Sequence, residues 1–161
     1  YPILNSSLDV EHESIIYKPY HNISVAMHTA MGLVVPNIKE VHHKSIMQIA
    51  QDLNMLHEKG LKGQLTPEDF SHGTFTLSNI GNFGGTVLTP VIMSPQVCIG
   101  ALGRIRVLPR FGPNGEVIKA SIMNVSFSGD HRVIDGTTMA SFTNLWKSYL
   151  ENPNLFMLDG H

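Results

Sequence analysis

The turn Pro113-Asn114-Gly115 limits the possible folds more than any other part of the sequence. An Asn-Gly pair tolerates the positive φ angles of a tight hairpin turn. The segments on either side, RIRVLPRF (104–111) and EVIKASIMNVSFS (116–128), are rich in Val and Ile. They are therefore predicted to pair as an antiparallel hairpin, so the fold has to contain antiparallel sheet.

Further strands are expected on both sides of the first helix. NISVAMH (22–28) alternates apolar and small or polar residues, and a turn joins it to LVVP (33–36), which predicts a second hairpin. Three later segments are rich in Thr, Val and Ile and are also predicted as strands: GTFTLSNIG (73–81), GTVLTPVIM (85–93) and QVCIGALGRIRVLPRF (96–111).

Helices are indicated by their caps. Ser45 and Gln48 match a capping box, and an apolar stripe follows up to Gly60, where the helix is expected to end. Thr66 and Pro67 predict the start of a short second helix. A last helix is expected to begin near Gly136 and to be ended by Pro153. The apolar stripe of the first of these helices contains Ile46, Ile49, Leu53 and Leu56, and that of the last contains Met139, Phe142, Trp146, Tyr149 and Leu150.

This order of elements predicts one α+β domain with a mixed, mostly antiparallel sheet and flanking helices. The length of 161 residues suffices for a core without metal or disulfide. Charged residues make up only 15% of the chain, which favours a protein whose surface is partly covered by other copies. A net charge of −2 without basic runs argues against nucleic acid or a membrane as a partner. The single cysteine, Cys98, lies in an apolar run and is expected to be buried.

His131 and Asp135 stand four residues apart, and Gly136 follows directly. Asp135 precedes the last helix, so its carboxylate is suited to cap the helix N-terminus. His131 alone can be an ordinary surface or core histidine. Shared metal binding by the pair is disfavoured, because Val133 and Ile134 indicate a strand or tight turn and no third ligand lies nearby.

A second cluster of interest lies at GTFTLSNIGNFGGT (73–86). Ser78 and Asn79 end a predicted strand, and Gly84 and Gly85 follow shortly after. These residues would present a hydroxyl, an amide and bare backbone N–H groups where a substrate could come close. A tight loop is the simpler explanation of the glycines, whose spacing is not that of a phosphate-binding loop.

Taken together, these motifs resemble the catalytic domain of the dihydrolipoyl acyltransferases of 2-oxoacid dehydrogenase complexes. That family shares a His-x-x-x-Asp-Gly signature and a fold with chloramphenicol acetyltransferase. The resemblance extends over nearly the whole chain and is closest to the branched-chain member. It is carried by GLVVPNI (32–38), GTFTLSNIGNFGGT (73–86), PVIMSPQVCIGALG (90–103), IMNVSFSGDHRVIDG (122–136) and NLWKSYLENP (144–153).

The resemblance implies a role for each candidate residue. His131 would be the general base that takes the proton from the thiol of coenzyme A or dihydrolipoamide. Ser78 would donate to the oxyanion of the tetrahedral intermediate, and Asp135 would hold the site in shape. Asn79, Gly84 and Gly85 would contact substrate, with no metal involved. Cys98, where the family favours alanine, and the pair His42-His43 depart from the family pattern without touching this chemistry.

The family also implies an assembly. Its members form trimers in which the histidine of one subunit faces the serine of its neighbour, and the trimers build a larger core. Expected partners are the decarboxylase and dihydrolipoamide dehydrogenase components, and the expected location is the mitochondrial matrix. Residues 1–161 are expected to be an N-terminally incomplete catalytic domain, without the domain that carries the lipoyl group and without an early arginine that pairs with the signature aspartate.

Two other functions remain open from the sequence. A catalytically incomplete chain could serve only to build the core. Alternatively, the same histidine could activate a hydroxyl in a small-molecule O-acetyltransferase, although the flanking segments similar to the branched-chain member count against this.

Overall fold

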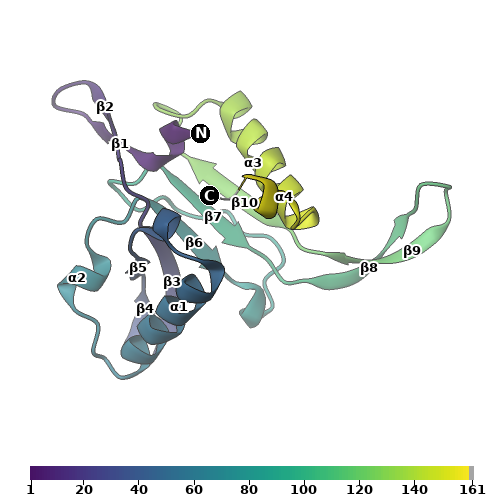
Figure 1. Cartoon of the computed structure of the whole chain (residues 1–161), viewed down its shortest axis with the longest axis horizontal. Coiled ribbons are helices and arrows are strands. Elements are labelled where there is room, and N and C mark those ends of the chain that lie inside the picture. Colours follow the sequence, from purple (N-terminus) through teal and green to yellow (C-terminus); the bar gives the residue numbers. More distant parts are fainter. Residues whose placement is uncertain (160–161) are drawn as a thin grey trace.

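The computed structural model describes residues 1–159, which form a central sheet with helices on one face and two hairpins that extend from it (Figure 1). The sheet has six strands in the order β10-β7-β6-β3-β4, and β5 pairs with β3. Its strands are β3 (Ile23–Thr29), β4 (Gly32–Val34), β5 (Asn37–Ile38), β6 (Phe75–Asn79), β7 (Cys98–Leu102) and β10 (Val125–Gly129).

Strand direction within this sheet is mixed. β3, β6 and β7 run parallel to one another, whereas β4, β5 and β10 run antiparallel to their neighbours. The remaining strands form two separate antiparallel pairs, β1 (Ser6–Asp9) with β2 (Ser14–Tyr17) and β8 (Arg106–Phe111) with β9 (Val117–Ile122). The predicted mixed, mostly antiparallel sheet with flanking helices is therefore confirmed.

Two helices of equal length cover the same face of the sheet, α1 (Ile46–Leu61) and α3 (Gly136–Glu151). Leu56 of α1 packs on Met27 of β3, and Met139 and Phe142 of α3 pack against the cluster around Cys98 of β7. The shorter elements are α2 (Pro67–Phe70), α4 (Leu155–Asp159) and the 3₁₀ turns η1 (Pro2–Asn5), η2 (Val41–His43) and η3 (Gly81–Phe83). Among residues 1–159, no helix is both long and apolar enough to cross a membrane.

The predicted helix starts are confirmed, and one predicted end is wrong. Ser45 accepts from the backbone N–H of Gln48 in a complete capping box, and Thr66 begins α2 with a second one. Gly60, however, lies inside α1 rather than after it. A Cβ at Gly60 would come within 3.2 Å of the Thr29 side chain, so this glycine allows close helix–sheet packing. The expected stripe is also shorter, because Ile46 is 76% exposed.

The hairpin around Asn114-Gly115 is confirmed, but it is a separate arm. Gly115 takes a φ of +85°, and the Gly112 N–H donates to the carbonyl of Glu116. Each predicted strand is divided in two: β8 and β9 pair only with each other, while β7 and β10 pair within the central sheet. Figure 1 shows β8 and β9 extending away from the rest of the chain.

The strand predicted at 85–93 is wrong. Residues 86–93 form no regular element, and Val87 and Val91 are 68% and 81% exposed. β1, β2 and α4 were not predicted from the sequence. The prediction for Cys98 is confirmed, because its side chain is fully buried.

Candidate active site

His131 lies in a tight turn between β10 and α3. The turn is closed by hydrogen bonds from the N–H groups of Val133 and Ile134 to the carbonyl of Asp130, at 2.9 and 2.8 Å. It is attached to the sheet because the Asp130 N–H donates to the carbonyl of Val97 at 2.8 Å. Ile134 anchors its other end in the core at 3% exposure. The His131 side chain is therefore presented at the surface from a rigid backbone.

A charge pair supports this turn and was not predicted. The guanidinium of Arg132 makes a two-pronged contact with the Asp130 carboxylate, with Nη2–Oδ2 at 2.6 Å and Nε–Oδ1 at 3.0 Å. These hydrogen bonds hold the pKa of Asp130 below its ordinary value. The residues directly flanking His131 thus carry opposite charges that neutralise each other, a pattern already visible in the sequence Asp-His-Arg.

Asp135 is the N-cap of α3, as predicted. Its Oδ1 accepts from the backbone N–H of Thr138 at 2.6 Å. This hydrogen bond is the main cause of a lowered Asp135 pKa. Asp135 is thus an ionised cap placed beside the histidine, a position from which it can fix the geometry of the turn.

Ser78 lies near the C-terminal end of β6, in the middle of the sheet. Its neighbours across the two parallel pairings are Ala26 of β3 and Ala101 of β7. Because side chains alternate along a strand, Ser78 faces away from α1 and α3, on the same face as Thr76. Two alanines at its sides leave the half-buried hydroxyl free to reach a partner on that face.

A buried polar network on this face was not predicted. Thr76 donates to Oε1 of Gln96 at 2.6 Å, and Nε2 of Gln96 donates to Ser24 at 3.3 Å. Ser24 and Thr76 are 2% and 1% exposed. The network joins residues up to 72 positions apart, so local sequence patterns carry no signal for it.

The glycine-rich loop follows Ser78 directly. The Asn79 side-chain oxygen accepts from the Gly81 N–H at 2.9 Å, which starts η3. Gly84 ends this turn with a φ of +91°, and Gly85 is packed so closely on Ile80 that a Cβ there would overlap its side chain. Asn79 lines a surface hollow of about 310 Å³, whereas Gly84 and Gly85 do not line it. Gly84 is therefore explained by its backbone conformation and Gly85 by its packing, and of the three residues expected to contact substrate only Asn79 lines the hollow.

One chain does not bring Ser78 and His131 together. Ser78 pairs in register with Ala101 of β7, and Ala101 pairs in register with Ser126 of β10. β10 then runs toward the opposite end of the sheet, and His131 follows its last residue, Gly129. At about 3.4 Å per residue and about 4.8 Å per strand, Ser78 and Gly129 lie about 14 Å apart. His131 lies beyond that point, so the serine and the histidine occupy opposite ends of the sheet.

Comparison with known proteins gives consistent matches. The family model for 2-oxoacid dehydrogenases acyltransferase (catalytic domain) matches residues 1–158. The lipoamide acyltransferase component of the mitochondrial branched-chain alpha-keto acid dehydrogenase complex of Mus musculus is 58% identical over 159 residues. That match covers 99% of this chain and 33% of the mouse protein, so the chain spans about a third of this curated relative.

Solved structures agree with the family match. The dihydrolipoamide acetyltransferase of Azotobacter vinelandii has a TM-score of 0.92 at 33% identity, over 97% of this chain and 64% of that one. The cubic core of a pyruvate dehydrogenase multienzyme complex also gives 0.92, at 32% identity over 97% and 64%. Chloramphenicol acetyltransferase gives 0.53 at 13% identity over 86% and 65%, a likeness of fold alone. The chain belongs to the family of 2-oxoacid dehydrogenase acyltransferase catalytic domains.

Proposed function

We propose that this chain transfers a branched-chain acyl group between dihydrolipoamide and coenzyme A. The observation that carries the proposal is the turn after β10, where a rigid backbone presents His131 beside an ionised Asp135 cap. Its substrate class follows from the 58% identity to the branched-chain relative. Acyl transfer between two thiols needs a base for the attacking thiol and a donor for the oxyanion, and His131 and Ser78 can fill these two roles.

In this mechanism His131 takes the proton of the attacking thiol. A thiol with a pKa of about 8.5 is mostly protonated near pH 7, and neutral imidazole is a suitable acceptor. The thiolate sulfur then attacks the carbonyl carbon of the thioester, and the carbonyl oxygen becomes an oxyanion that accepts a hydrogen bond from Ser78. Collapse of this intermediate breaks the original carbon–sulfur bond. The departing thiolate takes the proton back from the His131 imidazolium.

A related enzyme supports these assignments. Crystallographic and enzymatic work on the Azotobacter vinelandii acetyltransferase concerns the role of a serine, a histidine and an asparagine in its catalytic mechanism. There the histidine follows the serine by 52 residues and precedes the asparagine by four. Here His131 follows Ser78 by 53 residues and precedes Asp135 by four. An asparagine at the position of Asp135 would also accept the N-cap hydrogen bond without titrating, so we assign Asp135 a positioning role.

A complete site requires a second copy of the chain. With Ser78 and His131 at opposite ends of the sheet, the serine of one subunit and the histidine of a neighbour have to supply one site. A ring of identical head-to-tail contacts would provide such shared sites, and we propose a homotrimer because the family resemblance implies one. The relatives' cubic core supports further association into a larger hollow assembly.

The β8–β9 arm supports self-association independently. A two-stranded hairpin is at best marginally stable alone in water. This one exposes Val107, Phe111 and Val117 at 66%, 80% and 68%. Contact with a neighbouring subunit would cover these side chains and stabilise the arm.

The remaining assignments come from the relatives. We propose that residues 1–161 belong to an acyltransferase catalytic domain, that the lipoyl group is carried outside these residues, and that coenzyme A is the second substrate. Decarboxylase and dihydrolipoamide dehydrogenase components are the proposed partners. The relatives' names place them in mitochondria, and we propose the mitochondrial matrix for this protein.

The test is isobutyryl transfer from isobutyryl coenzyme A to free dihydrolipoamide. His131→Ala should lower the rate at least about 10²-fold, because a positioned base contributes about 10²–10⁴-fold. His57→Gln, on the exposed side of α1, is the matched control and should be as active as the wild type. Equal rates for His131→Ala and the control would overturn the assignment. An assembled wild-type protein that transfers nothing would favour a purely structural role, and acetylation of chloramphenicol instead would favour an O-acetyltransferase.

A further inference from the structure

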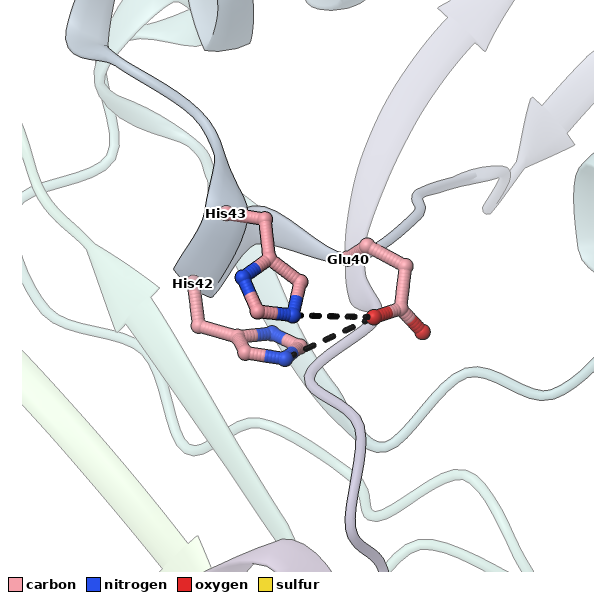
Figure 2. Close-up of side chains that lie close together, drawn as sticks. All are labelled: Glu40, His42 and His43. Atoms are coloured by element: carbon pink, nitrogen blue, oxygen red, sulfur yellow. Dashed lines mark ion pairs between the residues drawn. The ribbon is translucent and has the colours of Figure 1, made fainter.

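We propose that Glu40, His42 and His43 bind a divalent transition-metal ion, with Zn²⁺ the best match. These residues lie in the connection between β5 and α1, away from Ser78 and His131 along the chain. Figure 2 shows both imidazoles turned toward the Glu40 carboxylate. The Nε2 atoms of His42 and His43 lie 3.4 and 4.0 Å from Oε2 of Glu40. One ligand atom from each residue falls within 4.8 Å of the other two.

These spacings suit a small ion. Zn²⁺ binds imidazole nitrogen and carboxylate oxygen at about 2.0–2.2 Å, so the ligands of a tetrahedral site lie about 3.3 Å apart. Two of the present separations are therefore already within a small side-chain rotation of that value. Two imidazoles and one carboxylate form a donor set that suits Zn²⁺ and other divalent transition metals, whereas Mg²⁺ and Ca²⁺ prefer oxygen ligands alone. Three protein ligands leave a fourth position open to water.

The backbone holds the three ligands on one side of a short turn. Glu40 takes a left-handed conformation, with φ 52° and ψ 45°, which is unfavourable for a residue with a side chain. Its N–H donates to the side-chain oxygen of Asn22 at 2.9 Å, and its carbonyl accepts from the His43 N–H at 3.0 Å. Asn22 is only 5% exposed, so the turn is tied to a buried anchor. The strained conformation is therefore held by these hydrogen bonds, and in it the Glu40 carboxylate faces both histidines.

Ring packing restrains the histidines further. The rings of His42 and His43 lie 4.0 Å apart, and His21 packs edge-to-face on His42 at 4.8 Å. Because the backbone N–H of Val41 also donates to the carbonyl of His21, this third histidine is attached to the same turn. The side chain of His42 is 29% exposed, less than those of Glu40 and His43 at 47% and 73%. A partly ordered cluster loses less side-chain entropy when it closes on an ion than three free side chains would.

This site differs from the proposed catalytic chemistry, which uses no metal. All three ligands come from four consecutive residues, so a bound ion would fix the η2 turn that leads into α1. Its presence can therefore be measured without any reference to acyl transfer.

The test is Zn²⁺ titration by isothermal calorimetry of the assembled, untagged protein after removal of metal. The wild type should bind Zn²⁺ saturably. Compared with His43→Gln, it should bind one more ion per chain or bind Zn²⁺ with at least about tenfold higher affinity. This size is expected because loss of even an indirect partner of a metal site lowers metal affinity about 10–100-fold. His57→Gln lies outside the cluster and should bind like the wild type. Mg²⁺ should not compete. Bound Zn²⁺ should also raise the melting temperature of the wild type and of His57→Gln more than that of His43→Gln.

Two results would overturn the proposal. One is the absence of saturable Zn²⁺ binding by the wild type. The other is equal binding by the wild type, His42→Gln and His43→Gln, which would assign any bound ion to other histidines. Neither result bears on the acyltransferase proposal, because His131 and Ser78 are unchanged in every variant.

Discussion

If Ser78 and His131 of different subunits make one site, two inactive variants should restore activity to each other. His131→Ala keeps the serine, and Ser78→Ala keeps the histidine. Each variant alone lacks one group in every site, and each loss should lower turnover by about 10²-fold or more. In an assembly that contains both variants, some sites pair an intact histidine from one chain with an intact serine from another.

The size of this effect follows from counting subunits. If the two variants assemble at random in equal amounts, half of the histidines and half of the serines are intact. About one quarter of the sites then contain both groups, so the mixture should reach about 25% of wild-type activity in a cyclic assembly with one site per interface. The structural basis is the separation of about 14 Å between Ser78 and Gly129, with His131 beyond Gly129 at the opposite end of the sheet.

The assay is isobutyryl transfer to dihydrolipoamide after the two variants are produced together in one cell. Mixing the separately assembled variants is the control, because subunits that do not exchange should stay at the level of the single variants. A co-produced mixture no more active than the single variants, with normal assembly, would refute the shared site. In that case Ser78 and His131 would not act in a common step.

Three further predictions concern parts of the structure that support the site. Asp135→Asn should keep the cap on the Thr138 N–H and nearly all activity, whereas Asp135→Ala should lower both the melting temperature and the rate. Because the pKa of Asp135 is lowered in the folded state, its stabilising effect should be present above the ordinary carboxyl pKa and disappear as the pH falls through the lowered value. Thermal scans of Asp135→Asn should lack this pH dependence. Gly100→Ala would place a Cβ 2.7 Å from the Phe127 ring and should cost about 1–3 kcal/mol in urea unfolding, and an unchanged midpoint would contradict this packing. Burial raises the pKa of Cys98 to about 12, so roughly one thiol in ten thousand is ionised at pH 8. Iodoacetamide should therefore modify Cys98 only after unfolding, and rapid labelling of the folded protein would contradict this.

Local chemistry explains what the sequence could predict. The capping box at Ser45 and the cap at Asp135 each depend on residues within one helical turn, and both occur where predicted. The turn at Gly115 is likewise set by a few adjacent residues. Such elements are encoded in short segments, so their positions can be read before any tertiary contact is known.

Long-range contacts explain what the sequence could not predict. Residues 86–93 have the composition of a strand but pair with no strand among residues 1–159, and β6 and β7, which they connect, pair directly with each other. Gly103 separates β7 from β8, and its N–H donates to the carbonyl of Asn124 where the arm leaves the sheet. The division of two predicted strands therefore depends on a contact across 21 residues. The end of α1 is similar, since Gly60 is explained by Thr29 on another element.

The proposed active site combines both kinds of information. Its residue types and spacings stand in two short motifs, so Ser78 and His131 could be identified as candidates from the sequence alone. Their arrangement depends on strand direction, which neither motif specifies. If β10 ran parallel to β7, its last residue would lie at the same end of the sheet as Ser78, and one chain could hold both groups. Because β10 runs antiparallel, the same residues are placed at opposite ends, and the catalysis that we propose requires more than one chain.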